Sequence, residues 1–557
     1  MKFKKLLFLA ILLLAYLFRF NNLNWDSNFH LQPDERFLTM IGLAAKIPTN
    51  LSNYFNSGVS SLNPSNIGFK FFVYGILPIT FTKVVSIITN QQTYDQFTLL
   101  GRQLSAFSDV LVLIVVYKIV EIFEIKLKLN KSVKFWASFF YAVSVLPIQL
   151  SHFFTTDSFL NFFLLLSFYF SLRYWEKRRD KNLFLSAVFF ALALATKLNA
   201  VFILPLNLYF ILINSTKEKK WNFLIRNLVA YGLVSFITLF IADPYYFSQD
   251  FINSIKELVS FDNPNIWYPP GVQWIHKTPV LFSLINLAVF GVGIPYFIYI
   301  ILGIIKIIKN FKLKIKNLTL PIILVWMALF FLYQSTVYVK TVRYFIFLYP
   351  FLAIFAAFGV VTLLKFFKDN FFIKVAIVIS LLIWPVMFSS IYLHEHTRVT
   401  ASKWIYQNLP DNSLILSESW DDALPLPVDN IYNKRFTIEA LPVFDQDTQE
   451  KWEVMNLMLK TADYYVLSSN RGWGSIPTAP EKYPLMSKFY NDLLANKTPY
   501  KKIAEFTSYP QFKVFNFQFN FNDDWAEEAF TVYDHPKVMV FAKQKFVLLK
   551  TEGRTEK

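Results

Sequence analysis

The chain contains no cysteine, and this absence excludes disulfide bonds, thiol chemistry and cysteine-ligated metals. It leaves the redox compartment open, so a domain outside the cytoplasm is compatible with the composition. The sequence also has no glycine-rich phosphate-binding loop, no nucleophile elbow and no zinc signature. The short motifs of nucleotide-binding proteins, serine hydrolases and zinc enzymes are therefore missing.

Acidic residues are scarce, at 38 against 55 basic residues, which gives a formal net charge of +17. A nucleic-acid partner is not expected, because the basic residues lie mainly in short loops between apolar runs and no basic face carries interleaved aromatic residues. Apolar residues are abundant instead: the chain is 55% hydrophobic, with 63 phenylalanines and a mean hydropathy of +0.38. This composition predicts a multi-pass protein embedded in a lipid bilayer.

Apolar runs near the roughly 20 residues that a helix needs to cross a bilayer recur from residue 5 to about residue 393. The first run resembles a signal peptide but lacks a small-x-small cleavage site, so we expect an uncleaved span. Eleven transmembrane helices are predicted, at residues 5–22, 99–123, 133–151, 158–176, 182–196, 200–214, 222–242, 280–305, 318–336, 343–364 and 372–392.

The distribution of lysine and arginine predicts the orientation of these spans. The loops at 126–134, 173–181, 217–226, 306–316 and 365–374 carry 4, 5, 4, 5 and 3 basic residues, whereas 243–279 carries two. The positive-inside rule places the five basic loops and the N-terminus in the cytoplasm. Residues 68–89 are apolar, but a crossing there would turn every later basic loop outward. We therefore expect a juxtamembrane or re-entrant segment within one long outer loop, residues 23–97.

Residues 394–557 have a different composition, richer in Asp, Glu, Asn, Pro and Trp. The pattern predicts a soluble α/β domain outside the cytoplasm, with helices at 399–408 and 447–461 and strands near 413–418, 435–440, 464–468, 512–519 and 537–547. The predicted fold is thus an α-helical polytopic membrane domain, residues 1–393, followed by an extracytoplasmic α/β domain, residues 394–557.

This topology gathers the unusual polar residues at the outer ends of spans or in outer loops. Charges at membrane depth are costly unless they face a cavity or one another, so their convergence predicts a polar site at the outer interface. The residues are His30, Asp34, Glu35, His152, Asp157, Lys197, Asp243, His276, Lys277, Lys340 and Arg343.

Several of these residues also have a simpler interpretation. Asp34 and Glu35, in HLQPDERFL, follow a proline and are suited to the first turn of a helix. Asp157 could cap the helix that follows it. Lys197 and Arg343 could extend to lipid headgroups. The aromatic loop 265–274 could form an interfacial belt rather than cover a lipid carrier or stack on a sugar.

The ordered set of motifs resembles the GT-C glycosyltransferases, in particular the group of protein O-mannosyltransferases and aminoarabinose transferases. The set comprises the PDE triplet after the first span, a long first outer loop, a second outer acid, the TK pair at 196–197 and the RY pair at 343–344. The resemblance covers roughly residues 1–393 and implies transfer of a sugar from a polyprenyl-phosphate donor to a protein or glycolipid acceptor. The reaction would take place on the outer face of the cell membrane.

The resemblance also implies roles for individual residues. Asp34 matches the catalytic acid of the first outer loop and would be the general base, with Glu35 orienting it or the acceptor. Asp157 would hold the acceptor, or join Asp34 and Glu35 in binding Mg²⁺ or Mn²⁺, although no metal requirement is predicted. Lys197 and Arg343 would bind the donor phosphate, with His276 and Lys277 as secondary candidates.

Two functions from other classes stay open. A transporter or flippase of lipid-linked sugars should carry ionisable residues or broken helices at mid-membrane in two related halves, and no internal repeat is visible. A non-catalytic scaffold would tolerate replacement of Asp34. The acidic and aromatic loop Ser417–Asp422 could bind carbohydrate or acceptor, or form a solvated strand end.

Overall fold

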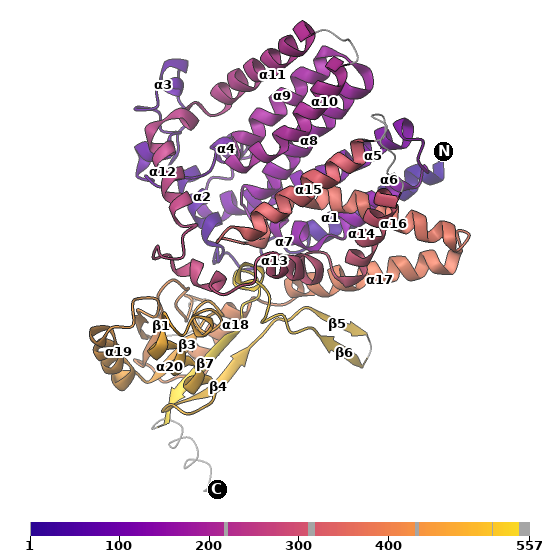
Figure 1. Cartoon of the computed structure of the whole chain (residues 1–557). Coiled ribbons are helices and arrows are strands. Elements are labelled where there is room, and N and C mark those ends of the chain that lie inside the picture. Colours follow the sequence, from indigo (N-terminus) through magenta and orange to yellow (C-terminus); the bar gives the residue numbers. More distant parts are fainter. Residues whose placement is uncertain (1, 217–220, 310–317, 429–433, 515, 545–557) are drawn as a thin grey trace.

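The computed structural model describes residues 2–216, 221–309, 318–428, 434–514 and 516–544. It has a large helical unit with a smaller unit of strands and helices at one end (Figure 1). The first helix is α1 (Lys2–Phe20), and the predicted first outer loop contains α2 (Pro33–Ala44), α3 (Leu51–Phe55), η1 (Pro64–Ile67) and α4 (Leu77–Ile88). The next helices are α5 (Tyr94–Lys126), α6 (Val133–Ala142), α7 (Val145–Ser151), α8 (Asp157–Lys177), α9 (Asp180–Leu194), η2 (Leu198–Ile203), α10 (Leu204–Thr216) and α11 (Trp221–Ala242).

The helical unit continues beyond α11 through short helices into the last long ones. These are η3 (Pro244–Phe247), α12 (Gln249–Ser260), η4 (Pro269–Trp274), α13 (Leu281–Ile285), the π-helical η5 (Asn286–Gly291), α14 (Ile294–Lys309), α15 (Thr319–Thr336), η7 (Val342–Leu348), α16 (Tyr349–Phe366), α17 (Phe371–Ser389) and η8 (Ser390–Leu393).

Each of the eleven predicted spans coincides with one helix or with consecutive helices. By length and composition, four helices of the described chain are suited to cross a membrane, and six if each of two bent pairs counts as one span. The bent pairs are α6 with α7, at 53°, and the α13–η5 segment with α14, at 117°. A helical unit with four to six candidate membrane spans is thus observed among the described residues, and the number eleven stays a prediction.

The segment 68–89 forms α4, whose 12 residues extend about 18 Å. A hydrocarbon core is about 30 Å thick, so α4 alone is too short to cross it, and its re-entrant or juxtamembrane placement stays a prediction. The turn before α4 is held against the end of α9, since the amides of Gly75 and Leu77 donate to the carbonyls of Thr196 and Ala195. A Cβ on Gly75 would lie 1.9 Å from the Ala195 carbonyl oxygen, so this close approach requires glycine.

The smaller unit contains a five-stranded sheet in the order β2-β1-β3-β7-β4. β1 is parallel to β2 and β3, and β7 is antiparallel to β3 and β4. The elements of the smaller unit are α18 (Thr397–Asn408), β1 (Leu414–Glu418), β2 (Thr437–Leu441), α19 (Gln449–Thr461), β3 (Tyr464–Leu467), η9 (Ile476–Thr478), α20 (Pro484–Leu494), β4 (Tyr500–Phe506), β5 (Gln511–Val514), β6 (Phe517–Asn520), α21 (Glu528–Thr531) and β7 (Val538–Lys543).

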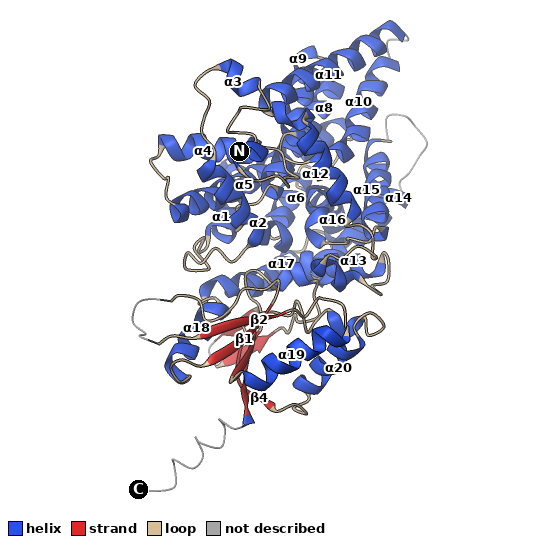
Figure 2. Ribbon diagram, turned by 90° about the vertical axis from the view of Figure 1, so that its left-hand side faces the viewer, coloured by secondary structure: helices blue, strands red, loops and turns tan. Residues whose placement is uncertain are grey.

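Alternating residues of the buried strands face opposite sides of this sheet. Ile415 and Val540 pack in one core with α18, whereas Leu416 and Phe541 pack in a second core with α19 and α20. The sheet therefore lies between two helical layers, as Figure 2 shows. The α/β class of this unit is confirmed, and the boundary at 393/394 stays a prediction.

Two details of the predicted domain are corrected. The segment 512–519 forms two strands, β5 and β6, which pair only with each other in a separate hairpin. The prediction also lacks α20 and β4. The end of the strand predicted at 537–547 lies outside the described residues, which show β7 to Lys543.

Candidate active site

Four of the predicted site residues meet where the helical unit adjoins the smaller unit. Arg343, at the start of η7, donates from Nη1 to Asp34 Oδ2 at 2.5 Å. It also donates from Nη2 and Nε to Asp157 Oδ2, at 2.8 and 3.2 Å. Lys197 donates from Nζ to the other oxygen of Asp157 at 2.9 Å. Two acids and two cations from four segments thus form one charge cluster.

Helix starts place the two acids. Pro33 fixes the first position of α2, and Gln32 caps this helix by accepting from the amide of Glu35 at 2.6 Å. Asp157 is the first residue of α8, where the positive end of the helix favours a carboxylate. The exposures differ: Asp157 is 1% exposed, whereas the side chain of Asp34 is 31% exposed. Asp34 is therefore the acid that a bound molecule could reach.

Tyrosines surround the cluster. The ammonium of Lys197 lies 5.0 Å from the ring centre of Tyr344 and 5.8 Å from that of Tyr74. Burial and the nearby Asp34 raise the pKa of Tyr268, which belongs to the aromatic loop 265–274. A pocket beside Arg343 is lined by Gln32 and Gln149 of the helical unit and by Tyr533 of the smaller unit. The site therefore lies between the two units.

Glu35 belongs to a different cluster, although it is adjacent to Asp34. Its carboxylate accepts from Arg102 Nε and Nη2, at 2.8 and 2.5 Å, and from the amide of Phe154 at 2.8 Å. The same guanidinium donates to both oxygens of Asp26, at 3.0 and 2.7 Å. Glu35, Arg102 and Asp26 are all fully buried. The contacts of Glu35 thus fix α2 to α5 and to the segment before α8, and Arg102 connects them to the segment after α1.

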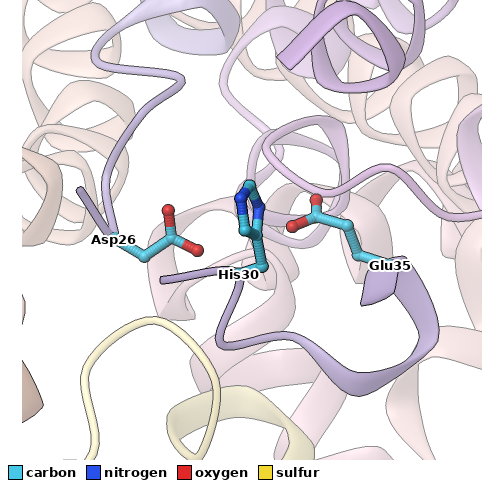
Figure 3. Close-up of side chains that lie close together, drawn as sticks. All are labelled: Asp26, His30 and Glu35. Carbon is cyan, nitrogen blue, oxygen red and sulfur yellow. The ribbon is translucent and has the colours of Figure 1, made fainter. Parts of the chain in front are cut away.

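Asp26, His30 and Glu35 each place one ligand atom within 4.8 Å of the others (Figure 3). They are the single such group of three among the described residues. Because Arg102 donates to both carboxylates, their charges are already paired with a cation. The predicted ligand set of Asp34, Glu35 and Asp157 is not gathered, since Glu35 pairs with Arg102 and the other two pair with Arg343.

His276 and Lys277 lie apart from this charge cluster. His276 Nε2 lies 2.6 Å from Glu481 Oε1 of the smaller unit, and both side chains are exposed. The ammonium of Lys277 lies 5.7 Å from the ring centre of Phe282, and burial lowers its pKa. Neither residue pairs with Asp34 or Asp157.

Sequence reasoning missed an ion pair that connects the two units and the pairs that hold its acid in place. Arg36, two residues after Asp34, donates to Asp422 at 2.8 Å. Within the smaller unit, Arg398, in the first turn of α18, donates to Asp421 and Asp422, each at 2.6 Å. The signal was present as two acids in the loop after β1 and an arginine beside the PDE triplet, but nothing in the sequence paired them.

Residues 97–245 match the sequence profile of the family described as dolichyl-phosphate-mannose-protein mannosyltransferase. No curated protein sequence matches the chain significantly. The matched segment contains Asp157 and Lys197, and Arg343 connects it to Asp34 outside it.

Solved structures with a similar arrangement include the oligosaccharyltransferase AglB from Archaeoglobus fulgidus, in complex with an inhibitory peptide and a dolichol-phosphate. It is 12% identical, with a TM-score of 0.49 over 94% of this chain and 75% of that chain. Another is ArnT from Cupriavidus metallidurans in the apo state, at 14% identity and a TM-score of 0.45 over 98% of each chain. ArnT bound to undecaprenyl phosphate has a TM-score of 0.43 at 14% identity, over 97% of this chain and 98% of that chain. Residues 97–245 carry the sequence pattern of the dolichyl-phosphate-mannose-protein mannosyltransferase family, and this match confirms the resemblance to GT-C glycosyltransferases that the sequence predicted.

Proposed function

We propose that this protein transfers a sugar from a polyprenyl-phosphate-linked donor to a protein, lipid or cell-surface glycan acceptor at the outer face of the membrane. The observation that carries the proposal is the guanidinium of Arg343, held between an accessible acid, Asp34, and a buried acid, Asp157. The family match over residues 97–245 supports the same class of reaction.

The proposed reaction needs a base for the acceptor and a cation for the leaving group. The acceptor hydroxyl oxygen forms a bond to the anomeric carbon of the sugar, and its proton passes to the carboxylate of Asp34. The bond between the anomeric carbon and the phosphate oxygen breaks, and polyprenyl phosphate leaves with the electron pair. Asp34 suits the base because it is the more accessible of the two acids.

Arg343 suits the leaving phosphate because a guanidinium can donate two parallel hydrogen bonds to phosphate oxygens. Its ion pair with Asp34 occupies one oxygen of that carboxylate while the guanidinium stays bound to it. A donor phosphate would compete for Nη1 of Arg343 and so uncover Asp34 when the donor is in place. Asp157 and Lys197 would hold the rest of the guanidinium and the local charge in position.

Glu35 would act as a positioning residue. Its contacts with Arg102 and the Phe154 amide fix the first turn of α2, on which Asp34 lies. The described acids do not fit a bound Mg²⁺ or Mn²⁺, because Asp34, Glu35 and Asp157 are divided between two arginines. The proposed chemistry therefore uses fixed cations of the chain.

We also propose that the C-terminal unit lies outside the cytoplasm and that His276 and Lys277 act at most as secondary phosphate ligands. The pairing of Arg36 with Asp422 supports the first point, since it places this unit against the predicted outer loop. The basic residues of the opposite loops support the same orientation.

The experiment is release of free polyprenyl phosphate from a mixture of polyprenyl-phosphate sugars and acceptors by the purified protein in detergent. We expect release by the wild type and loss of release in Asp34→Asn, which removes the base at nearly constant volume. Asp250→Asn, an exposed acid on α12 in the same predicted outer region, is the matched control and should keep wild-type turnover. Wild-type turnover by Asp34→Asn would refute the assignment of the base.

A further inference from the structure

Two tryptophans from different units meet beside the candidate active site. Trp267 belongs to the aromatic loop between α12 and η4, and Trp420 belongs to the loop after β1. Their ring centres lie 5.7 Å apart at an interplanar angle of 73°. Trp267 is 50% exposed and Trp420 is 46% exposed. An edge-to-face pair covers only one face of one ring, and about half of each tryptophan is exposed to solvent.

The backbone of Trp420 has a conformation that is unfavourable for tryptophan. Trp420 has a φ of +71°, in the left-handed region that a bulky side chain rarely adopts. Arg471 donates to its carbonyl at 2.5 Å and pairs with Glu528 at 2.7 Å. The loop is thus fixed although its largest side chain stays half exposed.

Ion pairs and a hydrogen bond connect this loop to the two segments that carry Asp34 and Arg343. On one side, Asp422 accepts from Arg36, two residues after Asp34 in α2. On the other side, the residue next to Glu528, Glu527, accepts from the amide of Val342, which precedes Arg343, at 3.1 Å. The loop that carries Trp420 is therefore connected through side-chain contacts to the segments that carry Asp34 and Arg343.

A hydrogen bond also fixes the side chain of Trp267. Its indole N–H donates to the carbonyl of Phe444 in the smaller unit at 3.1 Å, which fixes the ring. The following residue is Tyr268, which lies close enough to Asp34 for that carboxylate to raise its pKa further beyond the effect of burial. The loop that carries Trp267 therefore runs past the candidate site.

We infer that Trp267 and Trp420 form a subsite for the acceptor and that the acceptor carries a sugar ring there. This inference rests on the proposed function and selects a saccharide among the acceptors left open above. The apolar face of a pyranose stacks on an indole ring while its hydroxyls stay in water, which suits a half-exposed aromatic pair. Of the charged groups nearby, Arg36 has a side chain that is 36% exposed and can donate to the ring hydroxyls, whereas Asp421 and Asp422 are paired with Arg398.

The test is binding of three trisaccharide probes, maltotriose, mannotriose and chitotriose, to the full-length protein in detergent, by saturation-transfer difference NMR. We expect at least one probe to bind the wild type and to bind about tenfold more weakly to Trp267→Ala and Trp420→Gly. Trp420→Phe should keep most of the affinity. Trp221→Ala, at an exposed tryptophan at the start of α11, is the matched control and should bind as the wild type does.

The variant Trp420→Gly separates a binding role from a structural one. Glycine adopts a φ of +71° without strain, so this variant should unfold at the same or a higher temperature than the wild type. A lower unfolding temperature with unchanged sugar binding would assign Trp420 a packing role and overturn the inference. Binding of no probe by the wild type would also overturn it, as would Trp420-dependent binding of a serine- and threonine-containing hexapeptide in place of the sugars.

Asp34→Asn distinguishes this inference from the proposed function. This variant should keep wild-type affinity for the trisaccharide, because the stacking rings do not need the base. Sugar binding without release of polyprenyl phosphate from any donor would refute the transfer reaction and keep the subsite. Release without sugar binding would keep the reaction and refute the subsite.

Discussion

A single arginine organises the candidate site. Arg343 contacts Asp34 with one nitrogen and Asp157 with the other two, which a planar guanidinium can do and a lysine ammonium cannot. This geometry explains why an acid from α2 and an acid from α8 come together although they are far apart in the sequence.

Arg343→Lys should therefore weaken donor binding while charge is conserved. We expect the KM for the lipid-linked donor to rise about tenfold, because the bidentate phosphate contact is lost. Initial rates at increasing donor concentration measure this change. Arg226→Lys, at an exposed arginine near the other end of the helices, is the control. An unchanged donor KM in Arg343→Lys would exclude the phosphate-binding role.

A second buried residue gives the smaller unit a defined pH response. Glu418, at the end of β1, is 4% exposed, and burial raises its pKa to about 7 although Tyr465 and Tyr490 donate to it. Its folded pKa lies above the unfolded value, so its contribution to stability is complete below about pH 4.5 and is lost as the pH rises through about 7.

Glu418 should accordingly lower the free energy of unfolding of the wild type at pH 8 relative to pH 5, by at most about 3 kcal/mol. Glu418→Gln should remove that contribution, because the amide does not titrate. Intrinsic tryptophan fluorescence of the protein in detergent, heated at both pH values, measures the difference. An equal fall in the wild type and the variant would contradict the assignment. Glu527, whose pKa burial also raises to about 7, contributes with the same sign in both proteins.

At the level of elements, the backbones of α14 and α16 approach each other closely. A Cβ on Gly303 of α14 would lie 1.8 Å from the carbonyl oxygen of Phe355 in α16, and a Cβ on Gly359 of α16 would lie 2.1 Å from that of Tyr299. Reciprocal small residues of this kind let membrane helices approach closely.

Gly303→Ala should consequently separate α14 from α16 and lower the yield of folded protein. A methyl group has no space there, and the contacting atom is a backbone oxygen that cannot rotate away. Gly232→Ala is the matched control, since a Cβ there meets nothing within 4 Å. Size-exclusion chromatography in detergent compares the two variants. Equal yields would show that the helices can adjust.

The elements also show what could be predicted from the sequence. Helices of the membrane unit were predictable because a bilayer requires long apolar runs, and the buried strands β1 and β3 because of their short apolar runs. β4 was missed because Lys501, Lys502 and Glu505 give an edge strand a polar sequence. The candidate acids were predictable from their order along the chain.

The division of those acids between two arginines was not predictable. Arg102 lies inside α5, where periodicity indicates only a span, and its pairing with Asp26 and Glu35 depends on tertiary packing. The same holds for Arg36 and Asp422, which belong to different units.

At the level of the whole molecule, the absence of cysteine allows a direct test of orientation. We predict that Lys497→Cys, exposed in the C-terminal unit, reacts with a membrane-impermeant maleimide added to intact cells. Lys181→Cys, exposed at the start of α9 in a basic loop, should react only after the cells are lysed. Labelling of Lys181→Cys in intact cells with protection of Lys497→Cys would reverse the predicted topology.

The ion pair between Arg36 and Asp422 joins residues that are 386 positions apart in the chain. During synthesis, α2 and its acid therefore emerge long before the loop that holds them. With the predicted orientation, this contact forms only after β1 and the loop behind it have been exported. In a polypeptide still attached to the ribosome, the helix that carries Asp34 would lack its contact with Asp422. The candidate site would therefore be completed only when translocation of the C-terminal unit ends.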